Sequence, residues 1–163
     1  MAKVQVSLSF RISLVSLFVL TLSSCSGVSS LTPDNLQSAQ KRWENSGPSY
    51  YRMVVETKGD GMEPSKYEVT VQNREVIKFV RNGELSESKS GQGYSMEGLF
   101  HVLDQELDLK KKPELLGAPP GFASYPMASF DPQNGRLLRF QRSVGGAKRS
   151  MEIDVKEFQV LGK

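Results

Sequence analysis

The chain has 163 residues with 21 basic and 18 acidic side chains, so its formal net charge is +3. The first 24 residues hold two of the basic residues and no acidic one, which leaves a balance of 19 to 18 over the remaining 139 residues. This near-neutral balance gives no support for nucleic-acid binding, which would show as a basic stripe or patch. A length of 139 residues is enough for one domain with a hydrophobic core and too short for two of ordinary size.

The N-terminus has the pattern of a secretory signal peptide. Lys3 and Arg11 are the only charged residues before Cys25, and a short apolar run at 12–22 separates Arg11 from a group of small residues. That run is shorter than the roughly 20 apolar residues that a permanent membrane-spanning helix requires. We therefore predict a signal peptide at 1–24 rather than an uncleaved anchor helix.

The end of this leader, Leu22-Ser23-Ser24-Cys25, resembles the bacterial lipobox, with Ser24 where Gly or Ala is usual. The resemblance implies that Cys25 receives a diacylglycerol on its sulfur and becomes the first residue of the mature chain. Two or three acyl chains hold a protein stably at a membrane, since each buried methylene adds about 0.8 kcal/mol. We expect a lipid-anchored protein of the cell envelope. If the host is Gram-negative, Ser26 after the cysteine favours the outer membrane.

Cys25 is the only cysteine, so no disulfide forms within the chain and the fold must be held by burial of apolar residues. We expect residues 25–32 to form a lipidated N-terminus with a short serine-rich tether, and residues 33–163 to form a single domain. Thr32-Pro33-Asp34 predicts the start of a helix, because it combines a capping hydroxyl, a proline in the first turn and an acid near the positive end of the helix dipole. Gly47-Pro48 predicts its end.

Alternation of apolar and polar residues predicts three strands, around 51–55, 66–71 and 76–80. The second and third are separated by Asn73-Arg74, which we expect to form a tight hairpin turn. In the third strand, Ile77 and Phe79 are expected to lie on the same side. Residues 82–94 are polar and contain glycine, and we expect an irregular connection there.

Ser95 predicts the N-cap of a second helix, and this helix is the most clearly amphipathic in the chain. Its apolar residues recur with helical spacing at Met96, Leu99, Phe100, Leu103 and Leu107. Residues 113–126 contain four prolines and two glycines and predict an irregular connection. Three further strands are expected near residues 127–130, 138–141 and 151–155.

The order of helix, three strands, helix and three strands predicts the α+β class. Strands joined mainly by hairpins pair antiparallel, so we expect a mostly antiparallel sheet of about five to six strands with two helices packed on one face. The sequence leaves the strand order open.

The mature chain also resembles a family of small bacterial lipoproteins and secreted proteins catalogued as a domain of unknown function. The resemblance is carried by Trp43 with Tyr50-Tyr51 and by segments 67–71 with 76–77, 95–100, 130–135 and 151–155. The chain departs from the family pattern at Asn73-Arg74, where an Asp-Gly type of turn is commoner, and at Arg136-Leu137-Leu138, where an aromatic residue and a proline are commoner. The resemblance implies a fold and a location and no activity.

His101 is the only histidine, and it shares a polar helix stripe with Glu97, Asp104 and Asp108. A Glu/His pair one helical turn apart could ligate a metal, but a metal site usually needs three or four fixed ligands. We therefore interpret the stripe as a solvated helix face and expect no metal and no other cofactor. The chain has no G-x-S-x-G elbow, P-loop or G-x-G-x-x-G motif, so we assign no catalytic residue.

Two further groups of residues have more than one interpretation. Trp43, Tyr50, Tyr51 and Tyr67 could line a ligand groove, although aromatic residues at these spacings more often belong to a core. The basic run 110–112 could touch anionic lipid headgroups near the anchor, although a solvated helix end is the simpler interpretation.

Leu115, Leu116 and Phe122 lie in a loop region that a small domain has difficulty burying. If they are exposed, they form an apolar patch of the kind that marks a partner surface. We therefore expect a membrane-anchored, non-catalytic binding or inhibitory module whose partner is another envelope protein. One alternative is an envelope hydrolase or metal-dependent enzyme whose site assembles from scattered acids and His101. The other alternative is a carrier that holds a lipid-like ligand between sheet and helices.

Overall fold

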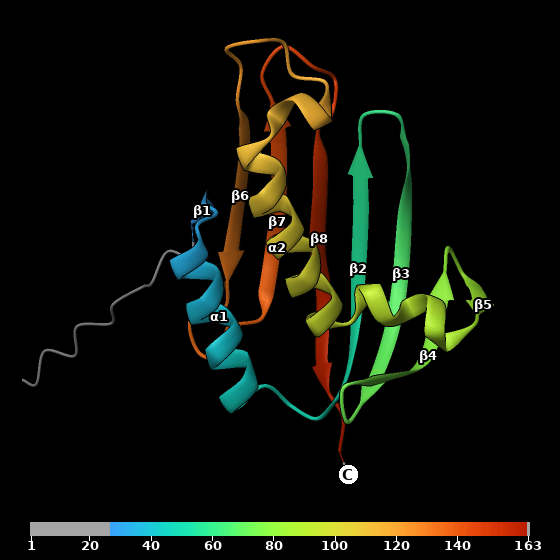
Figure 1. Ribbon diagram of the computed structural model, residues 1–163. Coiled ribbons are helices and arrows are strands. Elements are labelled where there is room, and N and C mark those ends of the chain that lie inside the picture. The colour runs from blue at the N-terminus through green and yellow to red at the C-terminus, as the bar shows by residue number, and fades with distance from the viewer. Residues whose placement is uncertain (1–26, 163) are drawn as a thin grey trace, which may run out of the picture.

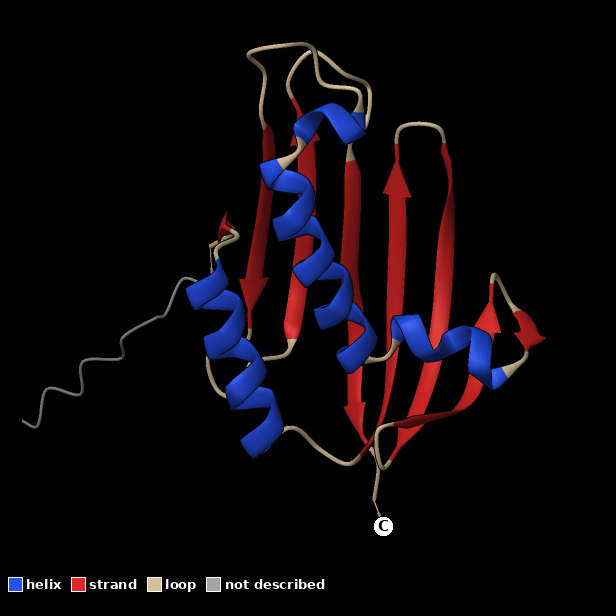
Figure 2. Ribbon diagram, viewed as in Figure 1, coloured by secondary structure: helices blue, strands red, loops and turns tan. Residues whose placement is uncertain are grey.

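The computed structural model describes residues 27–162, which form one antiparallel sheet with the helices on one of its faces (Figure 1 and Figure 2). The sheet has eight strands in the order β1-β6-β7-β8-β2-β3-β4-β5. The α+β class and the mostly antiparallel sheet are confirmed. The expected count of five to six strands is wrong, because a short strand is added at each edge of the sheet.

The strands are β1 (Ser29–Ser30), β2 (Tyr50–Gly59), β3 (Met62–Gln72), β4 (Glu75–Arg81), β5 (Glu84–Ser86), β6 (Ser124–Phe130), β7 (Leu137–Val144) and β8 (Met151–Val160). The helices are α1 (Pro33–Ser46) and α2 (Met96–Lys111), with two 3₁₀ helices, η1 (Ser88–Tyr94) and η2 (Pro113–Leu116). Segments 82–94 and 113–126, which we expected to be irregular, therefore contain β5, η1, η2 and the first residues of β6. These elements are too short to show a hydrophobic period in the sequence.

Both α-helices begin where the sequence predicts. The Thr32 hydroxyl accepts a hydrogen bond from Asn35 N at 3.3 Å, and the Asn35 side chain accepts one from Thr32 N at 3.0 Å, which completes a capping box. Ser95 Oγ accepts from Gly98 N at 3.1 Å at the start of α2. Gly47 ends α1 by donating its N–H to the carbonyl of Trp43 at 2.7 Å.

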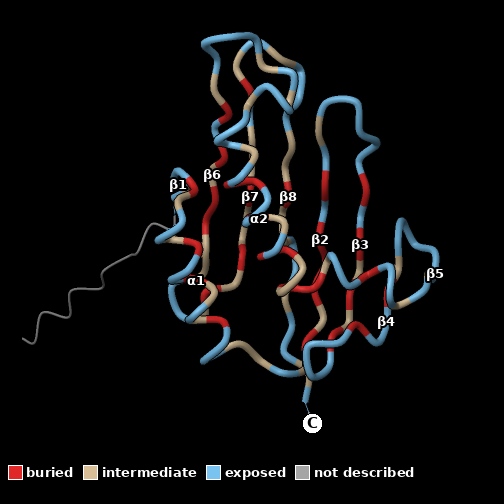
Figure 3. Tube along the Cα trace, viewed as in Figure 1, coloured by how far each residue is buried: buried red, intermediate tan, exposed pale blue. Residues whose placement is uncertain are grey.

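The core lies between the helices and the sheet, and its buried residues alternate along the central strands (Figure 3). Tyr51, Met53 and Val55 of β2 face the helices, while Arg52 and Glu56 face the opposite, open side of the sheet. This alternation follows from the two-residue period of a strand. The sheet therefore has one apolar face under the helices and one polar face exposed to solvent.

The turn between β3 and β4 has the predicted geometry, since Asn73 and Arg74 have positive φ angles of 52° and 68°. The expected placement of Ile77 beside Phe79 is wrong. Val71 pairs with Val76 and Thr70 pairs with Lys78, so Ile77 is an extra residue in a β-bulge. The bulge leaves Ile77 exposed and keeps Phe79 buried.

Strand β1 falls within the segment expected as the tether. Ser29 pairs with Ala128 and Ser30 with Met127, and Leu31 beside them is fully buried. Cys25 and the predicted signal peptide lie outside the described residues. Over residues 27–162, no helix has both the length and the apolar composition needed to cross a membrane.

Candidate functional site

Three loop segments meet at one end of the sheet, which is uppermost in Figure 1. They comprise residues 59–63, 110–123 and 145–150, and we call them together the loop end. Asp60 N donates to the carbonyl of Ser150 at 3.2 Å, and Ser150 N donates to Asp60 Oδ2 at 2.8 Å. Gly145 N donates to the carbonyl of Ala123 at 3.0 Å. These hydrogen bonds join loops that are far apart in the sequence into one continuous surface.

Large apolar side chains are exposed on and beside the loop end. Leu115 is 66% exposed, Phe122 51% and Tyr125, the second residue of β6, 57%, and Met62 is exposed on the β2–β3 hairpin. We call these four residues the loop patch. Of the three residues proposed from the sequence as a partner surface, Leu115 and Phe122 are thus exposed, whereas Leu116 is half-buried.

Phe122 is held in place on its inner side although its outer side is open. A Cβ atom added to Gly145 would lie 2.8 Å from Phe122 Cδ1, and one added to Gly146 would lie 2.8 Å from Pro119 Cδ. Both distances are too short for real contacts, so the two glycines allow the β7–β8 turn to pack closely against the 113–123 loop. The exposed ring is therefore supported by backbone rather than carried on a loose loop.

The loop end is basic. It contains five basic residues, Lys110, Lys111, Lys112, Lys148 and Arg149, against three acidic residues, Asp60, Glu63 and Glu114. Its net charge of +2 is balanced by −2 over the rest of residues 27–162, where 13 basic residues face 15 acidic ones.

Some of these charges are engaged within the structure. Lys110 donates to the carbonyl of Leu31, and Lys111 pairs with Asp108. Hydrogen bonds from Ser150 hold the pKa of the Asp60 carboxyl below its usual value. Lys112, Lys148 and Arg149 are exposed and form no ion pair with any residue that the structure describes.

A groove of about 510 Å³ adjoins the loop patch on the open face of the sheet. Tyr125 and Met127 of β6 line one side, and Lys58 with Glu152 line the other. Gln141, which pairs with both Met127 and Glu152, lies between them. The groove crosses four strands, and its volume is in the range of small-molecule clefts, although it lies on the sheet surface and not inside the fold.

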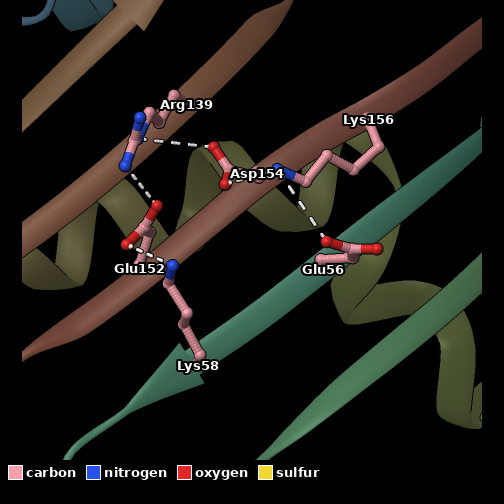
Figure 4. Close-up of polar contacts among 6 residues, drawn as sticks. All are labelled: Glu56, Lys58, Arg139, Glu152, Asp154 and Lys156. Atoms are coloured by element: carbon pink, nitrogen blue, oxygen red, sulfur yellow. Dashed lines mark hydrogen bonds and ion pairs between the residues drawn. The ribbon is translucent and has the colours of Figure 1, made fainter.

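The remainder of the open face carries ion pairs of alternating sign (Figure 4). Each side chain contacts the next in the series Lys58, Glu152, Arg139, Asp154, Lys156 and Glu56. The six residues come from strands β2, β7 and β8. Burial opposes ionisation of Asp154, but the hydrogen bond and charge of Lys156, together with the charge of Arg139 and a hydrogen bond with Glu152, outweigh it, so the pKa of Asp154 is lowered. Exposed ion pairs contribute little stability one by one. Their main effect here is to keep this face polar and solvated.

On the covered face, Glu97 connects α2 to the first helix and to the sheet. Its Oε1 accepts from the Trp43 indole N–H at 3.0 Å, and its Oε2 accepts from the Tyr51 hydroxyl at 3.3 Å. The Tyr51 oxygen in turn accepts from Met96 N at 3.0 Å. The interpretation of Glu97 as part of a solvated stripe is therefore wrong. Burial, and then the charge of Glu97, raise the pKa of the Tyr51 hydroxyl.

The other members of that stripe, His101, Asp104 and Asp108, are exposed, and His101 contacts only the side chain of Gln105 among the polar groups described. Within residues 27–162, no cluster of three or more His, Cys, Asp or Glu side chains is placed to bind a metal ion. Trp43, Tyr51 and Tyr67 are buried and belong to the core, whereas Tyr50 is only half-buried. The aromatic residues singled out in the sequence therefore do not converge on a groove.

The buried ion pair between Glu106 of α2 and Arg142 of β7 was not foreseen from the sequence. Arg142 Nη1 lies 2.5 Å from Glu106 Oε1, and Glu106 is 4% exposed. Burial raises the pKa of Glu106 against the opposing effect of Arg142. Arg142 Nε also donates to the carbonyl of Arg149 at 3.2 Å, so the pair links α2 to the loop end. One signal was available, because Glu106 lies three residues after Leu103 and next to Leu107, on the apolar side of the helix.

The comparisons with known proteins concern the first part of the fold. Residues 35–112 match a family of unknown function, DUF6174, whereas a comparison with curated proteins finds no match. The matched segment includes Trp43, Tyr51 and Glu97 and stops where the 113–123 loop begins. The similarity to the DUF6174 family, whose function is unknown, is therefore limited to residues 35–112.

Proposed function

We propose that this chain is a lipid-anchored, non-catalytic binding module of the cell envelope and that the loop end is its contact surface. The apolar leader and the lipobox-like Leu22-Ser23-Ser24-Cys25 support the anchor. Acylation of Cys25 leaves only three residues between the lipidated cysteine and Ser29, the first residue of β1. The domain is then held close to the membrane with little freedom to move away.

The observation that carries the proposal is the exposure of Leu115 and Phe122 on a fixed frame. Leaving a leucine or phenylalanine side chain in water forgoes about 1.5–3 kcal/mol relative to full burial. The neighbouring loops are joined by hydrogen bonds, so these side chains do not gain exposure through disorder of the backbone. A contact made outside the folded chain accounts for apolar groups held in this way.

The filled interior supports surface binding over the two alternatives. The space between the sheet and the helices is occupied by one cluster of apolar side chains, which includes Leu99, Leu103 and Phe140. A carrier of a lipid-like ligand would need an apolar cavity in that place. A hydrolase or metal-dependent enzyme would need polar groups that converge on a pocket. His101 lies on α2 away from the groove of the open face, at a smaller hollow of about 210 Å³ whose Glu97 is already held by the Trp43 indole and the Tyr51 hydroxyl.

Two measurements in cells test the proposal. Metabolic labelling with a fatty acid should mark the wild-type chain and not the Cys25→Ala variant, and label retained by that variant would refute acylation at Cys25. A photo-crosslinking amino acid at position 122 should yield adducts, whereas the same amino acid at Leu85 should not. Leu85 is a matched control, because it is 74% exposed but lies on β5, at the opposite edge of the sheet from β6. Equal crosslinking at both positions would contradict the contact surface.

A further inference from the structure

We propose that the loop patch docks onto an anionic lipid bilayer, with Phe122 and Leu115 entering the interface and the basic residues of the loop end lying beside the lipid phosphates. This inference rests on the loop end being the contact surface, as proposed above. It does not require that Cys25 be acylated. It names the partner of this surface as the membrane itself.

The first argument is the form of the loop patch. Its apolar side chains come from separate segments, the β2–β3 hairpin, η2 and the loop before β6. They are exposed at the end of the sheet, in a loop and in elements next to loops, which suits a surface that can yield and accept protruding groups. The interface of a bilayer accepts such groups without a preformed pocket, whereas a folded protein partner must supply one.

The position of Tyr125 agrees with this assignment. Its ring is exposed beside Phe122 at the start of β6, next to the polar residues of the open-face groove. Tyrosine is enriched at the boundary between lipid and water, because its ring is apolar and its hydroxyl remains hydrated. Docking through Phe122 and Leu115 brings Tyr125 to that boundary.

The second argument is the sign of the charge. Lys112, Lys148 and Arg149 are exposed around the loop patch and form no ion pair within the described chain. A basic side chain close to an anionic membrane surface strengthens binding about fivefold, so three of them are worth roughly a hundredfold. The rest of the described chain carries a net charge of −2, so the excess of positive charge lies at the loop end.

The position of the anchor permits this orientation. Ser29 pairs with Ala128, and β6 runs four residues from Ala128 back to Ser124, a span of about 13 Å. Strand β1 runs antiparallel to β6, so the chain before Ser29 leaves the sheet edge toward Phe130 and away from the loop end, and Cys25 lies at most about 14 Å from Ser29. The lipid on Cys25 and the ring of Phe122 therefore reach the same membrane when the whole β1–β6 edge of the sheet lies along it. The β5 edge then faces away.

A tryptophan substitution gives a direct readout of depth in the membrane. The full chain carrying Phe122→Trp is reconstituted into vesicles of phosphatidylcholine and phosphatidylglycerol, with and without bromine on the acyl chains. Bromine quenches only indoles that reach the acyl region, and the native Trp43 is buried in the protein core. The matched control is Leu85→Trp, an exposed site on the far edge of the sheet. Both substitutions replace exposed side chains, so neither is expected to disturb folding.

We expect bromine to quench the indole at position 122 and not the one at position 85. Adding Lys148→Gln and Arg149→Gln to Phe122→Trp should lower the ratio of docked to undocked loop ends about 25-fold. Weak or equal quenching at the two positions would overturn the proposal. Quenching that persists unchanged in pure phosphatidylcholine would overturn the assignment to anionic lipid. A protein adduct from the crosslinker at position 122, without bromine quenching, would instead assign this surface to a protein partner.

The result is separable from that of the anchor. Acylation is read independently, by the mass of the N-terminal peptide that contains Cys25. An unmodified Cys25 combined with quenching at position 122 would refute the lipid anchor and leave the docking inference standing. An acylated Cys25 without quenching at position 122 would support the lipid anchor and refute the docking inference.

Discussion

Replacing Tyr51 with phenylalanine tests the polar contacts that tie α2 to the rest of the fold. The Tyr51 hydroxyl accepts from Met96 N at 3.0 Å and donates to Glu97 Oε2 at 3.3 Å. The substitution removes both hydrogen bonds and keeps the aromatic ring. The ring contacts should survive, since Trp43 packs edge-on at 5.5 Å and Phe158 stacks at 5.2 Å.

The expected loss is about 2–4 kcal/mol of unfolding free energy. Met96 is fully buried, so its N–H has no access to water, and an unsatisfied buried donor costs about 1–3 kcal/mol. The bond to the ionised Glu97 adds about 1 kcal/mol, at the low end for a charged partner because it is long. For a domain of this size, a loss of 3 kcal/mol corresponds to a Tm lower by about 10 °C.

Urea denaturation followed by circular dichroism measures this loss. The matched control is Tyr125→Phe, which removes the same hydroxyl from a ring that is 57% exposed and should change stability by less than about 0.5 kcal/mol. Equal effects of the two substitutions would refute the role assigned to the Tyr51 hydroxyl.

The same variant should also change the response to alkaline pH. The pKa of Tyr51 is raised in the folded chain, so the unfolded chain loses its proton first as the pH increases. The stabilisation is complete below about pH 10 and is lost above it, by about 1.4 kcal/mol per pH unit, and Tyr51→Phe should remove this part of the slope. An identical alkaline slope in both proteins would contradict the argument.

Three further predictions concern the stability of the fold. Arg142→Met should lower the unfolding free energy by about 3–5 kcal/mol, because Glu106 is left buried without its partner. Urea unfolding should show that the double variant with Glu106→Leu recovers most of this loss. A double variant no more stable than the single one would contradict the prediction. Gly135→Ala should lower the Tm more than Gly61→Ala does, because both glycines have positive φ but only at Gly135 would a Cβ collide with the Ala39 carbonyl. An equal decrease in Tm would show that α1 shifts to make room for the methyl group. Glu68→Gln should reduce the fall of the unfolding free energy at acid pH. The hydrogen bond from Arg52 lowers the pKa of Glu68 in the folded chain. The resulting stabilisation is present above about pH 4.3 and is lost as the pH falls through the lowered folded pKa. Glu68 is half-exposed, so the change should stay below about 1 kcal/mol, and an equal fall of the urea midpoint from neutral to acid pH in wild type and variant would exclude any contribution.

The covered and open faces of the sheet have different consequences for function. The covered face is filled by apolar side chains and holds the Trp43–Glu97–Tyr51 contacts, which lie within the residues 35–112 that match DUF6174. The loop end lies outside that segment, apart from the β2–β3 turn and the last residues of α2. The match therefore includes Met62 and the basic run 110–112 and does not include Leu115, Phe122, Tyr125, Lys148 and Arg149.

Much of the local structure could be predicted from the sequence because it depends on neighbours in the chain. Thr32 and Ser95 cap the two helices, Asn73-Arg74 forms the hairpin turn, and the apolar period of 96–107 marks the buried side of α2. Each of these features involves residues a few positions apart, so the amino-acid types alone carry the information. The short apolar run before Cys25 belongs to the same class of local signal.

Only the tertiary structure decided which distant segments meet. Trp43 and Glu97 are 54 residues apart, Arg142 and Glu106 are 36 apart, and Asp60 contacts Ser150 across 90 residues. The strand order, the bulge at Ile77 and the two edge strands likewise depend on pairing between segments that carry no mark of each other. For the same reason, Leu115 and Phe122 could be singled out from a loop composition too apolar to bury, but their union with Lys148 and Arg149 required the fold.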